Sequence, residues 1–338
     1  MRCGLLMAGD DLTTWRRNLR AARAGGFWGI GLGDSQSLYP DPYVQGAVAS
    51  LEAPGLHVGP WVSNPVTRHP AVTARALHSI DMLTEGKAFL GIGIGDSAVR
   101  NLGLRPASLA DLEEYITAVR GLLRTGHGRW RGADLPFKEE PRPVPVYMAA
   151  SGPKGLRLAG RVADGVIVGA GLEPHMVQRA KEAVAEGAET SGRSLEDLDL
   201  WWPVVASLAE DDAEARRRIR AHLVTFAHFG LGRLTEWNGV PDEFVAALAE
   251  VQRRYRPINH AQSAVGSHAD LADELGLTDF LAERFAVSGT SASVLERIAD
   301  LERRGIDRIW VSLRVADKLP FLQQWSAEVA PALAGAGT

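Results

Sequence analysis

The sequence of 338 residues contains a single cysteine, Cys3, and this scarcity excludes several kinds of protein. No internal disulfide can form, which fits a reducing cytoplasm. The paired cysteines of zinc sites and the pattern of a phosphate-binding P-loop are also missing. No stretch reaches the roughly 20 apolar residues that a membrane-spanning helix needs. A net charge of −4 offers no basic field to nucleic acid or to an anionic membrane.

What the sequence does contain is a repeated pattern of a short apolar strand followed by an amphipathic helix. Hydrophobic residues make up 46% of the chain, which is ample for a core. The expected strands are residues 2–8, 28–32, 56–62, 88–94, 144–150, 163–169, 198–208 and 307–313. The expected helices are residues 11–24, 41–51, 70–83, 109–123, 153–160, 174–189, 212–226, 290–304 and 319–333. Eight strands alternating with helices favour an α/β fold of the (β/α)8 TIM-barrel type over a doubly wound sheet.

Two segments interrupt this pattern. Residues 126–142 predict a loop or a small hairpin, and residues 228–284 predict a mostly helical insertion with an irregular stretch at 255–266. We therefore expect one domain over residues 1–338, with the insertion near the mouth of the barrel. Its aromatic and cationic side chains suggest a lid over the substrate, and an oligomer contact is the alternative. The side chains in question are Trp237, Arg253, Arg254 and Tyr255.

The stretch at 56–97 carries the strongest signal. Ser63 and Asn64 precede Pro65, which ends the first of its two strands because proline lacks an N–H. The second strand is continuously apolar and ends in Gly95 and Asp96. Two neighbouring strands therefore place small and polar residues at the edge where parallel α/β folds bind ligands. The alternative is that these glycines only permit tight turns and close packing of strands.

Polar side chains follow most of the expected strands. Those that would meet at one mouth of a barrel are Asp34, Ser63, Asn64, Asp96 and Ser151. Each of them singly could instead cap a helix, since Asp, Ser and Asn are preferred at that position. Asp10 and Asp11, after the first strand, could act as acid or base or could cap the first helix.

Four motifs, in order, resemble the bacterial luciferase-like superfamily. They are VSNPVTRHPAVTARA, GIGIGDS, the AASGPK of residues 149–154 and the ADGVI of residues 163–167. The resemblance is to the branch of methylenetetrahydromethanopterin reductase and other enzymes that use the deazaflavin coenzyme F420. It implies an oxidoreductase that transfers a hydride between F420 and a small organic substrate at the mouth. The alternatives are a monooxygenase that uses reduced FMN and O2, and a non-catalytic flavin-binding barrel.

The resemblance also implies the site residues. Asp34 and Asp96 are the expected catalytic groups, and we expect no metal. The residues expected to bind the cofactor are Asp34, Trp61, Val62, Ser63, Asn64, Gly93, Ile94, Gly95, Asp96, Ala149, Ala150, Ser151, Gly152, Pro153 and Lys154. Relatives have a cis peptide where Trp61 meets Val62, with a smaller residue than tryptophan.

Some relatives also carry a histidine where this chain has Ser35, so proton transfer by a histidine cannot be assigned to that position. An unpaired carboxylate at either catalytic position would have a raised pKa. We also expect a cytoplasmic homodimer that acts on a small molecule and binds neither nucleic acid nor membrane.

Overall fold

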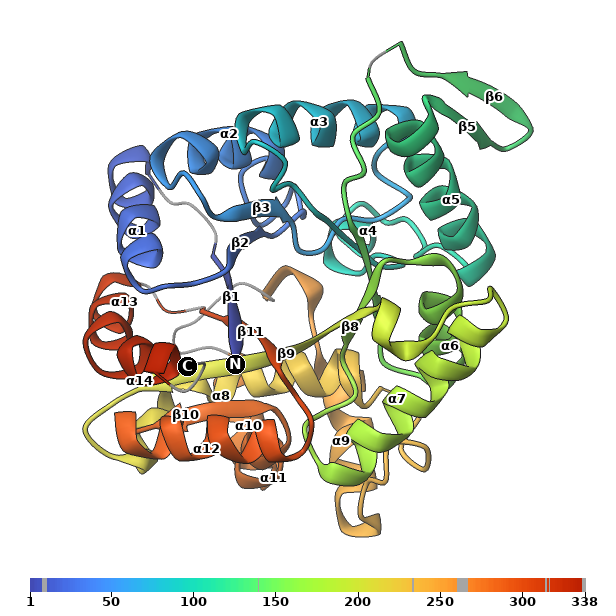
Figure 1. The fold of residues 1–338 in the computed structure, drawn as a ribbon. Helices are drawn as coiled ribbons and strands as arrows, with labels where there is room; N and C mark the ends of the chain where they lie inside the picture. Colours follow the sequence, from blue (N-terminus) through green and yellow to red (C-terminus); the bar gives the residue numbers. More distant parts are fainter. Residues whose placement is uncertain are drawn as a thin grey trace.

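Strands and helices alternate along the chain, and the strands form an inner ring (Figure 1). This computed structural model describes residues 1–7, 11–138, 140–232, 234–259, 267–313, 315 and 317–335. The strands are β1 (Arg2–Leu6), β2 (Gly29–Leu32), β3 (His57–Pro60), β4 (Leu90–Ile92), β5 (His127–Trp130), β6 (Ala133–Pro136), β7 (Val146–Ala150), β8 (Gly165–Val168), β9 (Asp199–Leu208), β10 (Ala286–Gly289) and β11 (Arg308–Ser312). The α-helices are α1 (Leu12–Ala24), α2 (Pro42–Glu52), α3 (Pro70–Leu83), α4 (Ser97–Arg100), α5 (Leu109–Thr125), α6 (Pro153–Val162), α7 (Pro174–Glu189), α8 (Asp212–Gly230), α9 (Asp242–Arg254), α10 (Ser267–Glu274), α11 (Thr278–Phe285), α12 (Ser291–Arg303), α13 (Leu319–Gln324) and α14 (Ala330–Gly335).

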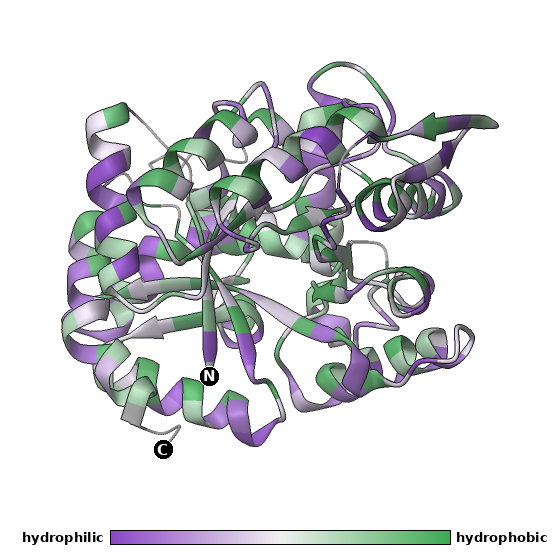
Figure 2. Cartoon of the chain, turned by 45° about the horizontal axis from the view of Figure 1, so that its top comes forward, coloured by the Kyte–Doolittle hydropathy of each residue, from purple (hydrophilic) through white to green (hydrophobic). Residues whose placement is uncertain are grey.

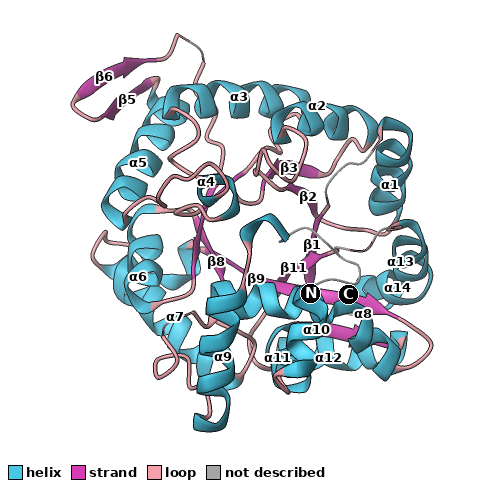
Figure 3. Ribbon diagram, turned by 180° about the vertical axis from the view of Figure 1, so that it is seen from behind, coloured by secondary structure: helices cyan, strands magenta, loops and turns pink. Residues whose placement is uncertain are grey.

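Eight parallel strands close into a barrel. Neighbouring strands follow the order β3-β2-β1-β11-β9-β8-β7-β4. Bridges between Val58 and Ala88 and between Ser63 and Ile92 join the β3 and β4 segments and complete the ring. The predicted (β/α)8 fold is confirmed, and the carboxyl ends of the strands share one rim. Figure 3 shows the ring from behind, with helices around it.

Polar side chains determine where several helices begin. Asp11 and Asp41 each accept two hydrogen bonds from backbone N–H groups in the first turns of α1 and α2. Ser108 and Asp111 form a capping box at the start of α5. Asp11 therefore has the capping role that was one of its two alternatives, while Asp10 lies outside the described residues.

Apolar faces attach the helices to the barrel. On α5, Leu112, Ile116, Val119 and Leu123 are fully buried, and they recur at steps of three and four residues. That spacing places them along one side of the helix. Figure 2 shows hydrophilic and hydrophobic residues on the surrounding helices in the same mixed pattern. Burial of these faces is the main favourable contribution to folding in such a layered architecture.

Large aromatic side chains fill the inside of the barrel. The rings of Trp61 and Trp310 stack with centroids 3.8 Å apart, and Trp201 meets Trp310 edge-on at 5.0 Å. Gly4 makes room for them, because a Cβ atom there would lie 2.2 Å from a ring carbon of Trp310. Trp61 thus packs in the core, where only 6% of it is exposed.

The sequence left two strand features undetermined. Residues 126–142 do contain a hairpin, β5–β6, which projects away from the barrel in Figure 1. A further strand, β10, pairs in parallel with residues 205–208 of β9, beyond the point where β11 ends. The sequence did not predict β10, because this strand has only four residues between α11 and the cap of α12. So short a stretch shows no hydrophobic periodicity.

The segment 228–284 is mostly helical, as expected. Its described part holds the end of α8, then α9, a 3₁₀ helix at Pro257–Asn259, α10 and α11. Leu248 and Val251 of α9 share an apolar cluster with Leu223 of α8 and Leu281 of α11. The part of the predicted irregular stretch at 260–266 lies outside the described residues. In the portion of the chain that the structure describes, every helix is too short or too polar to cross a bilayer.

Candidate active site

A buried carboxylate and a buried hydroxyl meet where β2 and β3 end. Oγ of Ser63 donates a hydrogen bond to Oδ2 of Asp34 at 2.6 Å, and the two residues are 1% and 8% exposed. Nε of Arg68 lies 3.4 Å from the same oxygen, and Nη2 of Arg68 binds Asp41 at 2.6 Å. The guanidinium therefore balances the charge of Asp34 while staying anchored to a second carboxylate.

Asn64 shapes the turn that follows. Its Oδ1 accepts hydrogen bonds from the N–H groups of Val66 and Thr67, and its Nδ2 donates to the hydroxyl of Thr67 at 3.0 Å. Gly95 lies against this turn, since a Cβ atom on Gly95 would come within 3.1 Å of the Asn64 Cβ. Gly95 also has a φ of +91°, which favours glycine. Asn64 thus has a structural role, and its contact with a cofactor stays a prediction.

A surface almost free of side chains lies at the end of β4. The N–H of Gly93 donates to the carbonyl of Ser63 at 3.0 Å, so the two segments run side by side. A Cβ atom on Gly93 would meet Val62 at 3.7 Å and Ala149 at 3.4 Å, which are ordinary contact distances. The Trp61–Val62 peptide is cis, as the resemblance implies. Gly93 is buried, and Val62 and Ala149 beside it are partly exposed, so the end of β4 is lined by small apolar groups.

The turn after β7 leads into α6. Gly152 precedes the helix without a capping side-chain bond, and Lys154 in the first turn is exposed. Ser151 lies beside the end of β8, since a Cβ atom on Gly169 would come 2.5 Å from its Oγ. Helix N-termini of this kind favour anions. Arg157 of α6 is paired with Glu186 of α7 at 2.5 Å, so its charge is already balanced.

The remaining predicted residues of these loops take different places. Ala150 is buried at the end of β7, and its carbonyl accepts a hydrogen bond from the N–H of Gly169. Pro153 is the first residue of α6. Ile94 follows β4 and is 43% exposed. The roles of all the predicted site residues remain predictions.

Asp96 is held by two cationic or polar partners. Its Oδ1 accepts a hydrogen bond from Nε of Arg100 at 2.7 Å and lies 3.7 Å from Nε2 of His228. Burial raises the pKa of Asp96, but the hydrogen bonds and charges of His228 and Arg100 outweigh burial and leave this pKa below its usual value. The carboxylate is therefore paired and ionised at neutral pH, unlike the unpaired carboxylate considered above. Among the described residues, its Oδ2 is buried without a hydrogen-bond partner.

His228 is a neighbour of Asp96 that the sequence does not reveal. It lies in the last turn of α8, far from Asp96 along the chain. Its ring stacks on Tyr255 with centroids 3.8 Å apart and planes 8° apart, and Tyr255 stacks on His268 at 4.8 Å. Burial, with the charges of His228 and Arg256, lowers the pKa of His268. No sequence signal links a helix end after β9 to a strand end at β4.

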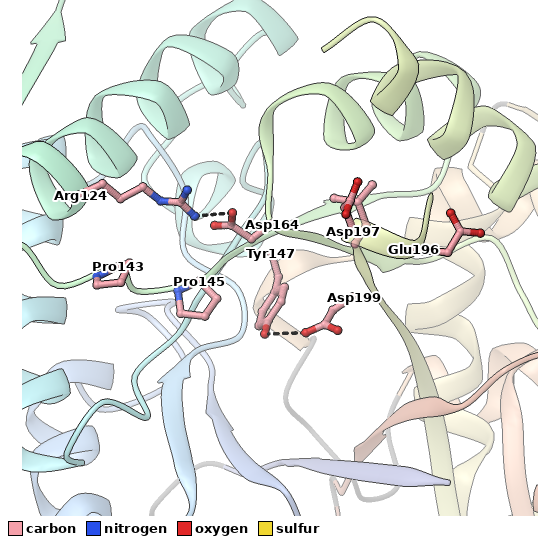
Figure 4. A pocket seen from close by; sticks show the side chains of 9 residues that line it. Arg124, Pro143, Pro145, Tyr147, Asp164, Glu196, Asp197 and Asp199 are labelled. Carbon is pink, nitrogen blue, oxygen red and sulfur yellow. Dashed lines mark hydrogen bonds and ion pairs between the residues drawn. The ribbon is translucent and has the colours of Figure 1, made fainter. Parts of the chain in front are cut away.

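A hollow of 280 Å³ lies at the opposite end of the barrel (Figure 4). Its lining includes Pro145, Asp164 and Leu198, which come just before β7, β8 and β9. The hydroxyl of Tyr147 donates to Asp199 at 3.2 Å there. Conserved chemistry in such barrels belongs to the other rim, and the described residues contain no cluster of three or more potential metal ligands. We therefore assign no site to this hollow.

Comparison with known proteins decides the family. The model of the family described as luciferase-like monooxygenase matches residues 3–308. The chain belongs to this family. Among its luciferase-like relatives, a 5,10-methylenetetrahydromethanopterin reductase of Archaeoglobus fulgidus is 28% identical over 296 residues, 85% of this chain and 86% of that protein. An F420-dependent glucose-6-phosphate dehydrogenase of Beutenbergia cavernae is 32% identical over 307 residues, 86% of this chain and 82% of that protein.

Solved structures of other proteins share the fold. The coenzyme F420 dependent tetrahydromethanopterin reductase of Methanopyrus kandleri superposes with a TM-score of 0.80 at 22% identity, covering 98% of both chains. An F420-dependent secondary alcohol dehydrogenase gives a TM-score of 0.72 at 16% identity, again over 98% of both chains. The resemblance stated from the motifs is thereby confirmed at the level of the family.

Proposed function

We propose that this protein is an oxidoreductase that transfers a hydride between coenzyme F420 and a small organic substrate. The observation that carries the proposal is the flat surface around Gly93. If an F420-dependent relative has a corresponding surface, both proteins would bind the cofactor in the same way. The proposal is supported by a relative that is named F420-dependent and that aligns over 86% of this chain. We place the reaction at the carboxyl-end mouth of the barrel, where Asp34, Ser63 and Asp96 converge on the rim.

The residues present fit a planar cofactor with a phosphate-bearing tail. Val62 and Ala149 are partly exposed, and Gly93 between them adds no side chain that would keep a ring away. The start of α6, with exposed Lys154, offers N–H groups and a positive charge to a phosphate. The side chains of Asp34 and Ser63 provide a polar edge next to this surface.

When bound, F420 supplies the hydride-accepting or hydride-donating centre. The barrel residues then hold the ring against the flat surface and keep water from it. Ser63 and Arg68 already contact one carboxylate oxygen of Asp34. The other oxygen is proposed to act on a ligand, either as a polar anchor or as an acid. Asp96, being ionised, accepts hydrogen bonds and orients His228 rather than donating a proton itself.

A monooxygenase that uses reduced FMN and O2 is the second candidate. The observation in its favour is that solved monooxygenases share the fold, for example an EDTA monooxygenase with a TM-score of 0.70 at 17% identity. Such a likeness concerns the fold alone. A flavin-binding barrel without catalysis is the third candidate.

Two assays separate the three candidates. Reduced F420 is mixed without O2 with a panel of carbonyl and imine compounds, and formation of oxidised F420 is followed optically. Reduced FMN is mixed with O2 and the same panel, and oxygenated products are measured. We expect turnover only in the first assay. Oxygenated products with FMN would favour the monooxygenase, and binding without turnover in both would favour the non-catalytic barrel.

The insertion is proposed to shape substrate access. Tyr255 reaches the mouth through its stack on His228. Arg253 and Arg254 instead pair with Glu250 and Glu274. The fourth predicted lid residue, Trp237, is half-buried beside α7, where its carbonyl accepts a hydrogen bond from Arg179. Deleting residues 236–262 would expose the apolar cluster under α9, so single substitutions near Tyr255 are the cleaner test.

A cytoplasmic homodimer is also proposed. Apolar side chains are exposed on two neighbouring helices, Val44 and Leu51 on α2 and Val72 and Met82 on α3. Contiguous exposed apolar side chains often mark a protein interface. Light scattering on the purified protein tests the dimer, and Val44→Glu with Val72→Glu should convert a dimer into monomers. A wild-type protein that is monomeric at micromolar concentration would contradict it.

A further inference from the structure

We propose that the substrate is an uncharged, largely apolar molecule with one carbonyl, imine or alcohol group, and that His228 exchanges the proton of this group while Asp96 holds the imidazole. The inference rests on the function proposed above, because it concerns the substrate side of the same mouth. It rests on three observations: the position of His228, the apolar side chains around it, and the engagement of the nearby cations.

The first observation is that His228 reaches the end of β4 from another part of the chain. Its Nε2 lies 3.7 Å from Oδ1 of Asp96, and the two side chains are 19% and 15% exposed. Nδ1 of His228 is buried and has no hydrogen-bond partner among the residues that the structure describes. The exposed part of the ring is therefore the edge away from Nδ1, which carries Nε2. A substrate oxygen at the mouth would therefore meet the Nε2 edge of His228.

The ring is also fixed in orientation. Tyr255 covers one face of His228 with planes only 8° apart, and His268 backs Tyr255 on its far side. Nε2 of His268 accepts a hydrogen bond from the backbone N–H of Arg256, which anchors the stack to the insertion. The carboxylate of Asp96 lies on the Nε2 side of the ring, and the stack keeps the ring in one orientation. The arrangement is that of a positioned proton carrier.

The chemical step balances with this residue. F420, when bound, would supply the hydride that the substrate carbon takes up in reduction, while the π electrons of the C=O or C=N bond would move to the heteroatom. The heteroatom would then take a proton from Nε2 of His228, which would regain one from solvent. In oxidation, Nε2 accepts the hydroxyl or amine proton as the hydride leaves carbon.

The second observation is that exposed apolar side chains surround this pair. They are Ile94, Leu102, Leu104, Phe229 and Ile258, with exposed fractions from 42% to 50%. Leu102 and Leu104 fold back onto α4 through hydrogen bonds to the carbonyl of Val99. Phe229 adjoins His228, and the 3₁₀ helix Pro257–Asn259 contacts α4. Binding an apolar body here removes these side chains from water.

The third observation is that several of the described cations near the pair already have partners, although Arg105, next to Leu104, is exposed. Arg100 binds Asp96 at 2.7 Å. Arg253 and Arg254 bind carboxylates of α9 and α10 at 2.5 Å and 2.8 Å. Arg256 donates to the backbone carbonyls of Arg253 and Tyr255. A phosphate placed next to Asp96 would face its ionised carboxylate, and at Arg100 it would have to displace an existing ion pair, which disfavours a sugar phosphate beside this pair.

The test uses the full chain and a panel of neutral cyclic ketones and alcohols, matched with glucose 6-phosphate and with carboxylated analogues. Histidine side-chain NMR of the cofactor-free protein follows each addition. Single-turnover hydride transfer with reduced F420 is then measured for wild type, His228→Ala and the control His268→Ala, with cofactor affinity measured separately. The control removes the ring on the other side of Tyr255.

We expect neutral ketones to shift the His228 resonances and glucose 6-phosphate to leave them unchanged. His228→Ala should lose about 10²–10⁴-fold in the hydride-transfer rate with little change in cofactor affinity. Added imidazole should restore part of the rate, which it could not do if His228 were only structural. His268→Ala should lose less than His228→Ala, and imidazole should not restore its rate.

Three results would overturn the inference: preference for the charged compounds, no binding of the panel near His228, or wild-type rates in His228→Ala. These outcomes are distinct from failure of the proposed function, which would appear as a wild-type protein that does not bind F420. In that case the NMR experiment on the cofactor-free protein still decides whether neutral ligands bind at His228.

Discussion

Trp61 stacks on Trp310 inside the barrel, with ring centroids 3.8 Å apart and planes 13° apart. Trp61 also forms the cis peptide with Val62, which lies at the proposed cofactor surface. Val62 packs against the aromatic cluster that contains Trp61 and Trp310, so this surface is joined directly to the aromatic core. The large side chain at position 61 is accommodated by glycines in the neighbouring strands. Gly31 is one of them, since a Cβ atom there would lie 2.7 Å from Cβ of Trp61.

Gly4→Ala should destabilise the protein because of this packing. The new methyl group would lie 2.2 Å from Trp310, whose ring is held by its stack on Trp61. Overpacking of this kind costs about 1–3 kcal/mol in unfolding free energy. The matched control is Gly93→Ala, where the methyl group would make only ordinary contacts. Urea unfolding of both variants measures the difference, and equal stabilities would show that the barrel interior is loosely packed.

Gly93→Leu should weaken cofactor binding without unfolding the barrel. Its side chain would extend over the flat surface between Val62 and Ala149, where the proposal places the ring. We expect at least a tenfold loss of affinity for F420, and little loss for Gly93→Ala. Circular dichroism checks that both variants are folded. Unchanged affinity in a folded Gly93→Leu protein would contradict the placement of the ring.

Asp34→Asn and Asp96→Asn should separate anchoring from proton transfer. Removal of a true general acid costs about 10²–10⁴-fold in rate, whereas loss of an anchor acts mainly through affinity. We expect Asp34→Asn to lower affinity, because Asp34 organises Ser63 and Arg68. Asp96→Asn should slow single-turnover hydride transfer by releasing His228. If both variants bind and react like the wild type, these carboxylates have no part in the reaction.

Asp96 should also contribute to stability in a pH-dependent way. Its pKa is lowered in the folded protein because His228 and Arg100 outweigh the opposing effect of burial. A lowered folded pKa gives a contribution that is complete above the unfolded pKa of about 3.9 and is lost as pH falls through the folded pKa. Asp96→Asn should therefore be less stable than wild type at pH 7, with the gap closing in acid. A gap that widens in acid would refute this assignment.

Cys3 should be unreactive in the native protein. Burial raises the pKa of its thiol to about 12, with a smaller opposing effect of the N-terminal amino group. The thiolate is the nucleophile, so at pH 8 a thiol reagent should modify Cys3 only after unfolding. Rapid labelling under native conditions, at the rate seen in urea, would show that β1 opens readily.

The repeating units of the fold could be predicted from the sequence, because each strand and helix carries its own periodicity. The run Leu90–Ile92 and the capped helix that starts at Ser291 are examples, and both appear where expected. The mouth could be predicted in part, since Ser63 and Gly93 follow strands that are neighbours in a barrel. The pairing of His228 with Asp96 could not, because it depends on how an irregular insertion packs across the rim.

β10 and the pairing of His228 with Asp96 could not be predicted from the sequence for a related reason. The pairing of β10 with β9 depends on the tertiary placement of four residues, not on a local pattern. The pKa of Asp96 is lowered first by His228 and then by Arg100, which lies one helical turn later at a spacing that the sequence contains. The contribution of Arg100 could therefore have been foreseen, whereas the larger contribution of His228 could not.

The most direct test of the central claim is a binding titration of the purified protein with F420 and, separately, with FMN, each oxidised and reduced. Fluorescence of the ligand or calorimetry gives the stoichiometry and the affinity. The account predicts saturable binding of F420 at one site per chain, with FMN bound at least tenfold more weakly, and loss of F420 binding in Gly93→Leu. Tight binding of FMN with none of F420 would contradict the proposed function.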